Sequence, residues 1–150
     1  MKKIPEQIKP DNKIQELMYE VEKLKSAVFQ LKNIIDNLPG DIYWKDINGV
    51  WSGVNVTGAK TLIKMRLINN HDEVIGKTDH ELFNKETADL FRKHDMDVMQ
   101  TGTELTKEET NILPSGEKII QLSTKKPLRD EHGNICGIIG NTIDITHLKK

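Results

Sequence analysis

The chain has 150 residues, with 22 Lys and Arg against 23 Asp and Glu, so its formal net charge is −1. That balance excludes the strongly basic surface of nucleic-acid-binding proteins and of electrostatic membrane anchors. A single cysteine excludes an internal disulfide and any multi-cysteine zinc or iron–sulfur centre. The longest apolar runs are too short for a transmembrane helix, and Ile4-Pro5-Glu6 stands where a signal peptide needs an apolar core. We therefore expect a cytoplasmic protein, with no nucleic-acid partner and no direct membrane insertion by this segment.

The first 38 residues contain a continuous heptad repeat of apolar residues. Apolar side chains recur alternately three and four positions apart, with a β-branched residue at every a position and leucine at every d position. In a parallel coiled coil that combination favours two strands. The alternative is an amphipathic helix that packs on its own domain. We expect a helix within 1–38 that forms a homodimer through Ile14, Leu17, Val21, Leu24, Val28, Leu31, Ile35 and Leu38.

The apolar periods shorten after Pro39-Gly40, which ends the helix. Asn48-Gly49 between two short apolar runs is a strong hairpin signal. We expect a polar loop over 69–72 and helices after Asn55, near 80–83 and over 85–100. We expect strands over 41–46, 50–54, 105–113, 118–124 and 135–145. Five strands with intervening helices predict an α+β domain, a five-stranded antiparallel sheet with its helices on one face.

A set of short motifs follows the same order as these elements. They are Leu38-Pro39, Tyr43-Trp44-Lys45-Asp46 with Asn48-Gly49, Asn55, Ile75-Gly76-Lys77-Thr78, Asp97 to Gly102, Gly116, Pro127 to Asp130 with Gly133, and Asp144-Ile145-Thr146. In order and spacing the set resembles the PAS (Per-Arnt-Sim) sensory domain of bacterial sensor histidine kinases. The resemblance implies a PAS fold over 39–146, preceded by the coiled-coil helix at 1–38. Residues 147–150 would begin a C-terminal signalling helix.

The resemblance implies a sensory role in a bacterial two-component system. Such a domain passes a ligand or conformational signal to a downstream output domain, here a histidine kinase that starts a phosphorelay. The chain itself is then not an enzyme, because it has no Gly-rich ATP-binding domain, and His147 is followed by Leu148 rather than by the acidic residue of a phosphoacceptor site. Two alternatives remain open: a PAS sensor of a diguanylate cyclase or phosphodiesterase, and a ligand-free PAS dimerisation module.

The resemblance also implies a ligand cavity between the sheet and the helices near 80–100. Alternate strand residues and the inner face of the long helix line such a cleft. The polar groups expected to orient a small ligand are Asn55 and Asn141. The same residues could instead form a closed core. The expected lining is Trp44, Asn55, Leu62, Phe83, Phe91, His94, Met99, Leu122, Ile139 and Asn141.

The sequence leaves the cofactor unknown, with a small molecule as one candidate. Haem-binding PAS domains use a histidine on the long helix, where His94 lies, but the polar stretch Arg92-Lys93-His94-Asp95 disfavours haem. Flavin-based light sensors of the family need a cysteine in a Gly-x-Asn-Cys-Arg motif, whereas Cys136 lies on the last strand, where we expect a small buried thiol. The histidine spacings predict no metal site. A solvated strand face is expected for Glu104, Glu108 and Glu109.

The terminal Asp-x-Thr motif is the expected signal relay. In PAS sensors this aspartate often pairs with a basic residue of the first strand, which here is Lys45. Because the first and last strands lie side by side in a PAS sheet, we expect an exposed Lys45–Asp144 ion pair, worth about 0–1 kcal/mol. Thr146 is expected to cap an exit helix that begins near Leu148.

Overall fold

The computed structural model describes residues 11–149, and the chain divides into two compact units after Ile35. Within those residues, no helix has both the length and the apolar character that a bilayer crossing requires. The interpretation of Met1 to Glu6 as unlike a signal peptide lies outside the described residues. So does Lys150, the last residue of the expected exit segment.

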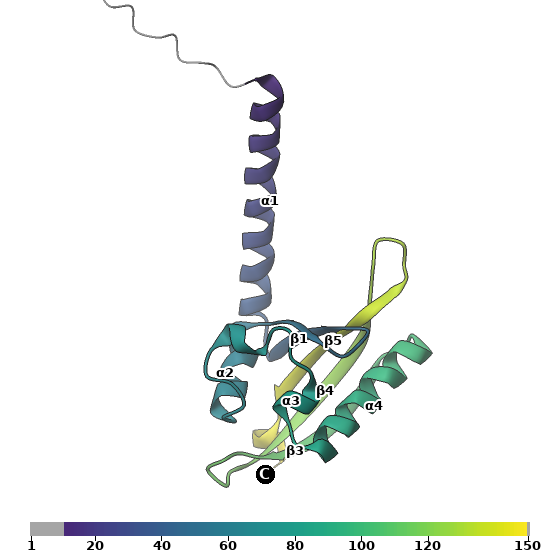
Figure 1. Ribbon diagram of the computed structural model, residues 1–150. Helices are drawn as coiled ribbons and strands as arrows, with labels where there is room; N and C mark the ends of the chain where they lie inside the picture. The colour runs from purple at the N-terminus through teal and green to yellow at the C-terminus, as the bar shows by residue number, and fades with distance from the viewer. Residues whose placement is uncertain (1–10, 150) are drawn as a thin grey trace, which may run out of the picture. The chain divides into compact units, whose positions relative to one another are not determined.

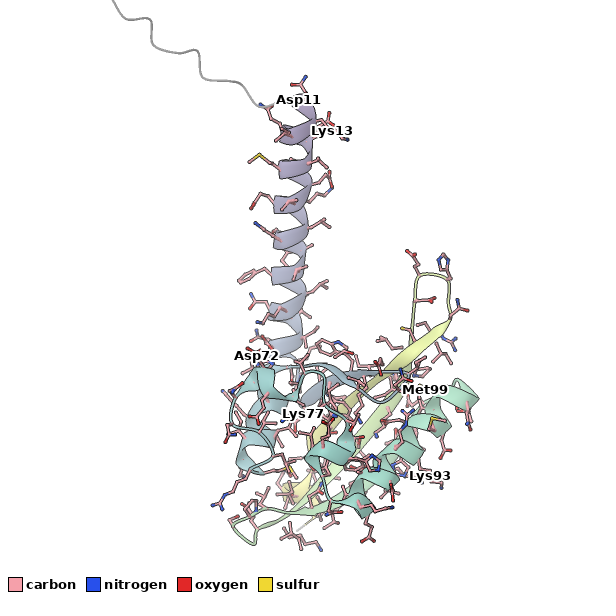
Figure 2. All side chains as sticks on the ribbon, viewed as in Figure 1. Asp11, Lys13, Asp72, Lys77, Lys93 and Met99 are labelled. Atoms are coloured by element: carbon pink, nitrogen blue, oxygen red, sulfur yellow. The ribbon has the colours of Figure 1, made fainter. Side chains whose placement is uncertain are left out.

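The long N-terminal helix, α1 (Asn12–Asn37), contributes the described part of the first unit. None of its residues is buried, and Leu24 and Val28 are 63% and 64% exposed. Figure 2 shows side chains projecting from α1 along its whole length. Helices in proteins owe most of their stability to the packing of an apolar face. The apolar a and d positions of the heptad repeat, called the seam of α1 below, therefore retain apolar area that a partner could bury.

The second unit, from Asp36 onward, contains a five-stranded antiparallel sheet in the order β2-β1-β5-β4-β3. In this order β1 and β5, the first and last strands along the chain, are neighbours in the interior of the sheet. The fold class expected from the sequence is thereby confirmed. The strands are β1 (Asp41–Asp46), β2 (Trp51–Val54), β3 (Leu105–Ile112), β4 (Lys118–Arg129) and β5 (Ile135–Asp144).

Figure 1 shows the helices of this unit on one side of the sheet. The α-helices begin and end at residues that suit those positions: the Asn84 side chain accepts a hydrogen bond from the Thr87 amide at 2.9 Å, and Gly102 ends the long helix with φ of 65°. Part of the expected polar loop over 69–72 is a 3₁₀ turn. The elements are α2 (Val56–Lys64), α3 (Asp79–Leu82), α4 (Lys85–Thr101) and the 3₁₀ turns η1 (His71–Val74) and η2 (Thr146–Lys149).

The apolar core lies beside one edge of the sheet, where β2 meets α2, η1 and α3. Its buried members are Trp51, Val54, Ala59, Leu62, Ile68, Val74 and Leu82. Tyr43 of β1 packs against this cluster, and its ring stacks on Trp51 with centroids 4.9 Å apart. The core therefore ends at the inner face of the central strands, where the polar residues described next begin.

Candidate functional site: a cavity above a charged sheet face

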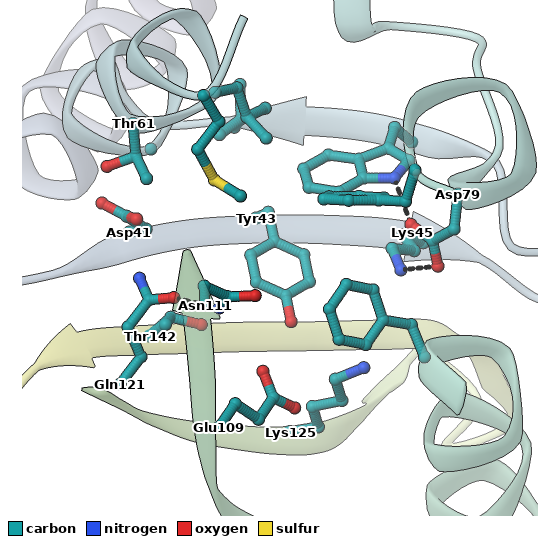
Figure 3. Close-up of a pocket in the computed structure, with 17 residues that line it drawn as sticks. Asp41, Tyr43, Lys45, Thr61, Asp79, Glu109, Asn111, Gln121, Lys125 and Thr142 are labelled. Carbon is teal, nitrogen blue, oxygen red and sulfur yellow. Dashed lines mark hydrogen bonds and ion pairs between the residues drawn. The ribbon is translucent and has the colours of Figure 1, made fainter. Parts of the chain in front are cut away.

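A cavity of about 80 Å³ lies between the inner face of the sheet and the helices (Figure 3). It exceeds the roughly 10–15 Å³ that one water molecule needs and is much smaller than the ~300–1,000 Å³ of drug-binding pockets. Its walls combine aromatic rings with an unusual number of charged and amide side chains. They are formed by Asp41, Tyr43, Lys45, Trp51, Val54, Gly58, Thr61, Leu62, Met65, Asp79, Phe83, Phe91, Glu109, Asn111, Gln121, Lys125 and Thr142.

Aromatic rings form much of the apolar part of the walls, together with Val54, Leu62 and Met65. Tyr43 stacks on Trp51, and Phe83 meets Phe91 edge to face with centroids 5.1 Å apart, both of which are favourable ring arrangements. Gly140 of β5 lies opposite Tyr43, and a Cβ at this position would come within 2.2 Å of the ring. Glycine is therefore required for the tyrosine ring to lie flat across the centre of the sheet.

Two lysines and two aspartates form a buried ion-pair network at one end of the cavity. Lys45 Nζ donates to Asp79 Oδ2 at 2.6 Å and to Asp95 Oδ2 at 2.9 Å. Lys125 Nζ donates to Asp95 Oδ1 at 2.6 Å, and the Trp51 indole N–H donates to Asp79 Oδ1 at 2.9 Å. The four charges cancel, and each carboxylate oxygen has a donor, which is what burial of charged groups requires.

This network joins the sheet to two of the helices that cover it. Lys45 lies on β1 and Lys125 on β4, while Asp79 lies on α3 and Asp95 on α4. All four side chains are at most 4% exposed. A group that enters the cavity and displaces the Lys45 ammonium therefore acts on the sheet and on both helices together.

Glu109 on β3 is a carboxylate of the cavity that this network does not neutralise. Its Oε1 is buried and has no hydrogen-bond partner among residues 11–149. Burial raises the pKa of Glu109, while Lys125 opposes that shift and Asp95 reinforces it. His94 Nδ1 lies 3.9 Å from Oε1, beyond hydrogen-bonding distance, and burial followed by repulsion from Lys125 and Lys107 lowers the pKa of His94.

The opposite end of the cavity is polar without a complete ion pair. Asn111 Nδ2 donates to Gln121 Oε1 at 2.7 Å. Burial raises the pKa of Asp41, and a hydrogen bond from Thr61 partly offsets this shift. Between the two ends, burial raises the pKa of Tyr43, so its phenol stays protonated and can donate a hydrogen bond. Residues 11–149 contain no group of three or more His, Cys, Asp or Glu side chains arranged to hold a metal ion.

Comparison with known families assigns this architecture. A family model described as the PAS fold matches residues 35–150. The chain belongs to the PAS family. The histidine kinase FilI of Methanothrix harundinacea, described as a regulator of methanogenesis, is 26% identical over 129 residues. That alignment spans 86% of this chain but only 14% of FilI, so the PAS chain corresponds to a small part of that relative.

Similar solved structures agree with this assignment. VqmA of Vibrio cholerae is 26% identical, with a TM-score of 0.70 over 80% of this chain and 52% of VqmA. A structure of VqmA bound to DPO is also 26% identical, with a TM-score of 0.68 over 78% of this chain and 57% of the other. The PAS domain of Bordetella pertussis BvgS, at 24% identity, shares the fold with a TM-score of 0.61 over 85% of this chain and 92% of that domain.

The structure places three of the predicted lining residues in the PAS cavity and puts three others on the wrong face of the sheet. Leu62, Phe83 and Phe91 line the cavity. Trp44, Leu122 and Ile139 do not line it, because the strand neighbours Tyr43 and Gln121 face the cavity instead and side chains alternate along a strand. Trp44 is directly opposite Ile139 in the register, on the face away from the helices. The prediction assumed that the apolar face of each strand is the inner one, whereas β1 and β4 direct Lys45, Gln121 and Lys125 inward.

The side chains of the two asparagines expected to orient a ligand form hydrogen bonds with backbone groups instead. Asn55 Oδ1 accepts from the amides of Ile42 at 3.0 Å and Gly58 at 2.9 Å and so caps α2, while its Nδ2 donates to the Gly40 carbonyl at 3.0 Å. Asn141 Nδ2 donates to the Pro39 carbonyl at 3.1 Å. Neither side chain lines the cavity.

Other expectations about single side chains are also corrected. His94 and Met99 of α4 lie outside the cavity lining. The Cys136 thiol is exposed rather than buried. Glu104, Glu108 and Glu109 do not form one solvated strand face, because Glu104 precedes β3 and alternation directs Glu109 inward.

The predicted Lys45–Asp144 ion pair is wrong. Lys45 points into the cavity and pairs with Asp79 and Asp95. Asp144 instead accepts from the amide of Thr146 at 2.9 Å and from its hydroxyl at 2.6 Å, and these bonds lower the pKa of Asp144. Thr146 lies within η2 rather than ahead of a helix, and its Oγ1 also accepts from the Ile120 amide at 2.9 Å.

Proposed function

We propose that this PAS domain senses a small molecule in its cavity and passes the signal to an output domain. The observation that carries the proposal is the position of Lys45 and Lys125, which line the cavity and also hold the ion-pair network between the sheet, α3 and α4. A ligand that contacts either ammonium changes the balance of forces between these layers. Such differential contact is what a ligand needs to shift a conformational equilibrium.

The route out of the domain is the end of β5. In this proposal, Thr146 fastens that end to β4 through the Ile120 amide, and Asp144 holds Thr146 in turn. Thr142 lines the cavity two residues before Asp144 on the same strand. A displacement of β5 by ligand therefore reaches the residues that lead out of the domain within a few peptide units.

The output favoured by the comparisons is a histidine kinase. FilI is one, and its alignment covers 86% of this chain. A DNA-binding output is the second candidate, favoured by the likeness to the LuxR-type receptor VqmA, one structure of which is a complex with ligand and DNA. A diguanylate cyclase or phosphodiesterase would use the same sensory module. The sequence downstream in the intact protein decides among these outputs.

The seam of α1 is proposed as the dimer contact of this cytoplasmic sensor. Ile14, Leu17 and Val21 are each about half exposed, at 50%, 53% and 47%. The pattern of β-branched a residues and leucine d residues favours a parallel pair of helices. A parallel pair would bury this area in both copies and place the two sensory domains in the same orientation.

A chimeric kinase tests the relay. The PAS domain of a sensor kinase is replaced by residues 35–150, in three linker lengths, and autophosphorylation is measured with and without a cavity-filling substitution, Thr142→Phe. The matched control is Ile143→Phe, because Ile143 is the next residue of β5, faces away from the cavity and is 39% exposed. We expect Thr142→Phe to change activity at least twofold in a responsive chimera and Ile143→Phe to leave it unchanged. Equal activities for all three proteins at every linker length would contradict the relay.

A further inference from the structure

A carboxylate in the wall of the cavity, that of Glu109, has one oxygen without a hydrogen-bond partner in the described part of the chain. Glu109 Oε1 is buried, and residues 11–149 provide it with no hydrogen-bond donor. The surrounding acidic groups differ in this respect, since Asp79 and Asp95 each accept two charged or polar hydrogen bonds. A buried acceptor without a donor carries a free-energy cost, and a ligand donor that reaches this carboxylate would remove it. Figure 3 shows the Glu109 carboxylate pointing toward the Tyr43 hydroxyl, in the middle of the cavity.

The charges around the cavity exclude an anionic ligand. The charges of Lys45 and Lys125 are already matched by Asp79 and Asp95, which leaves Glu109 and Asp41 in excess. An anion would therefore meet net negative charge in a site that screens it poorly.

The positions of the two ammonium groups also disfavour a cationic ligand. Lys45 Nζ lies 5.2 Å from the centre of the Trp51 ring and 5.5 Å from that of Tyr43, and Lys125 Nζ lies 5.2 Å from that of Phe91. These are the ring faces on which an organic cation would bind. A third positive charge would have to enter beside two that are already fixed.

Size and shape restrict the ligand further. A cavity of about 80 Å³ is far below the volume of drug-binding pockets, so it accommodates a single small ring rather than a fused or branched molecule. The rings of Tyr43, Trp51, Phe83 and Phe91 give the cavity apolar walls that such a ring can contact.

We infer that the cavity selects a compact, uncharged ring compound that bears an O–H or N–H group, and that Glu109 accepts the hydrogen bond from this group. The inference rests on the proposed ligand-sensing function and adds to it the chemical class of the ligand and the residue that recognises it. The apolar walls supply affinity for any ring of suitable size, whereas Glu109 supplies the preference for a donor.

The test uses four single-ring probes that differ in one substituent: phenol, toluene, benzoate and benzylammonium. Binding to the 150-residue protein is followed by the shifts of backbone amide NMR signals. We expect phenol to bind at least tenfold more tightly than toluene, because the two have similar shapes and only phenol donates to the carboxylate. Benzoate and benzylammonium are expected to bind more weakly than phenol.

The variant Glu109→Met removes the acceptor and keeps the side-chain length. We expect it to bind phenol and toluene equally. The matched control is Glu108→Met, because Glu108 is the preceding residue of β3, does not line the cavity and pairs on the surface with Lys149 at 2.8 Å. This control should keep the preference for phenol, and both variants are checked for folded spectra before titration.

The outcomes separate this inference from the proposed function. Equal binding of phenol and toluene to the unmodified protein, or a preference for phenol that survives Glu109→Met, would overturn the role of Glu109 while leaving a ligand cavity in place. Tightest binding of the anion or the cation would overturn the ligand class. Absence of binding by every probe would count against both this inference and the proposed ligand-sensing function.

Discussion

Replacing Lys45 by methionine should be among the most destabilising substitutions in the domain. Lys45 is 2% exposed and donates to two buried carboxylates, those of Asp79 and Asp95. Methionine fills a similar volume and makes no hydrogen bond, so Asp79 keeps only the Trp51 indole and Asp95 keeps only Lys125. Removing one partner of a buried pair costs about 3–5 kcal/mol, because an uncompensated charge stays in a medium that solvates it poorly.

Thermal and urea unfolding followed by circular dichroism measures this cost. For a domain of this size we expect the melting temperature to fall by roughly 10–25 °C. The control is Lys126→Met. Lys126 follows Lys125 on β4, its side chain is 60% exposed, and its ion pair with Glu104, at 3.2 Å, is worth about 0–1 kcal/mol. A loss below ~1 kcal/mol for Lys45→Met, equal to that of the control, would refute a buried network that depends on this ammonium.

Three further predictions concern other parts of the chain. Because burial raises the pKa of Glu109, ionisation of this carboxyl opposes folding as the pH rises above about 4.5. In urea unfolding, Glu109→Gln should therefore be more stable than the unmodified protein at pH 7.5 and no more stable than it at pH 4. A result with the reverse sign would contradict the burial of this carboxylate. The pair Leu24→Glu and Leu31→Glu should convert a dimer into a folded monomer in sedimentation velocity, since like charges would face each other in the seam; a dimer that persists would assign the contact elsewhere. Gly140→Ala should displace the Tyr43 ring and lower the melting temperature, whereas an unchanged value would mean that the ring does not lie on β5.

The sequence predicted the fold well because the signals that form turns and begin or end helices are local. Asn48-Gly49, Asn55 and Gly102 mark a hairpin, a helix start and a helix end, and each does so in the structure. Turn and cap chemistry depends on neighbouring residues alone, so it can be recognised in the sequence without knowledge of tertiary contacts. The order of the sheet followed from the family resemblance rather than from these signals.

The cavity was predicted poorly because its chemistry reverses the usual pattern. On β1 and β4 the more polar residues face inward, where Lys45 is 2% and Gln121 7% exposed, while Trp44 faces outward. Hydrophobicity alone assigns the opposite face. Burial of Lys45 is possible because it pairs with Asp79 and Asp95, which lie 34 and 50 residues away in the sequence. No local sequence pattern predicts these pairs.

One signal in the sequence did point to the inner face. Strand β3 reads Leu105-Thr106-Lys107-Glu108-Glu109-Thr110-Asn111-Ile112, with no apolar alternation, so neither of its faces is suited to a closed apolar core. A strand of this composition within a sheet covered by helices indicates a polar cavity. The glutamate and asparagine that line it, Glu109 and Asn111, occupy alternate positions of this strand.

The central claim, that this PAS domain holds a small molecule in its cavity, is tested most directly by native mass spectrometry of freshly purified protein. We predict a retained mass that is released on denaturation, that is absent from Thr142→Phe, whose side chain would fill the cavity, and that is kept by Ile143→Phe on the opposite face. Protein that carries no added mass and gains none when supplied with small-molecule extracts of the cells that produce it would contradict the claim. It would favour a PAS domain that acts through dimerisation alone.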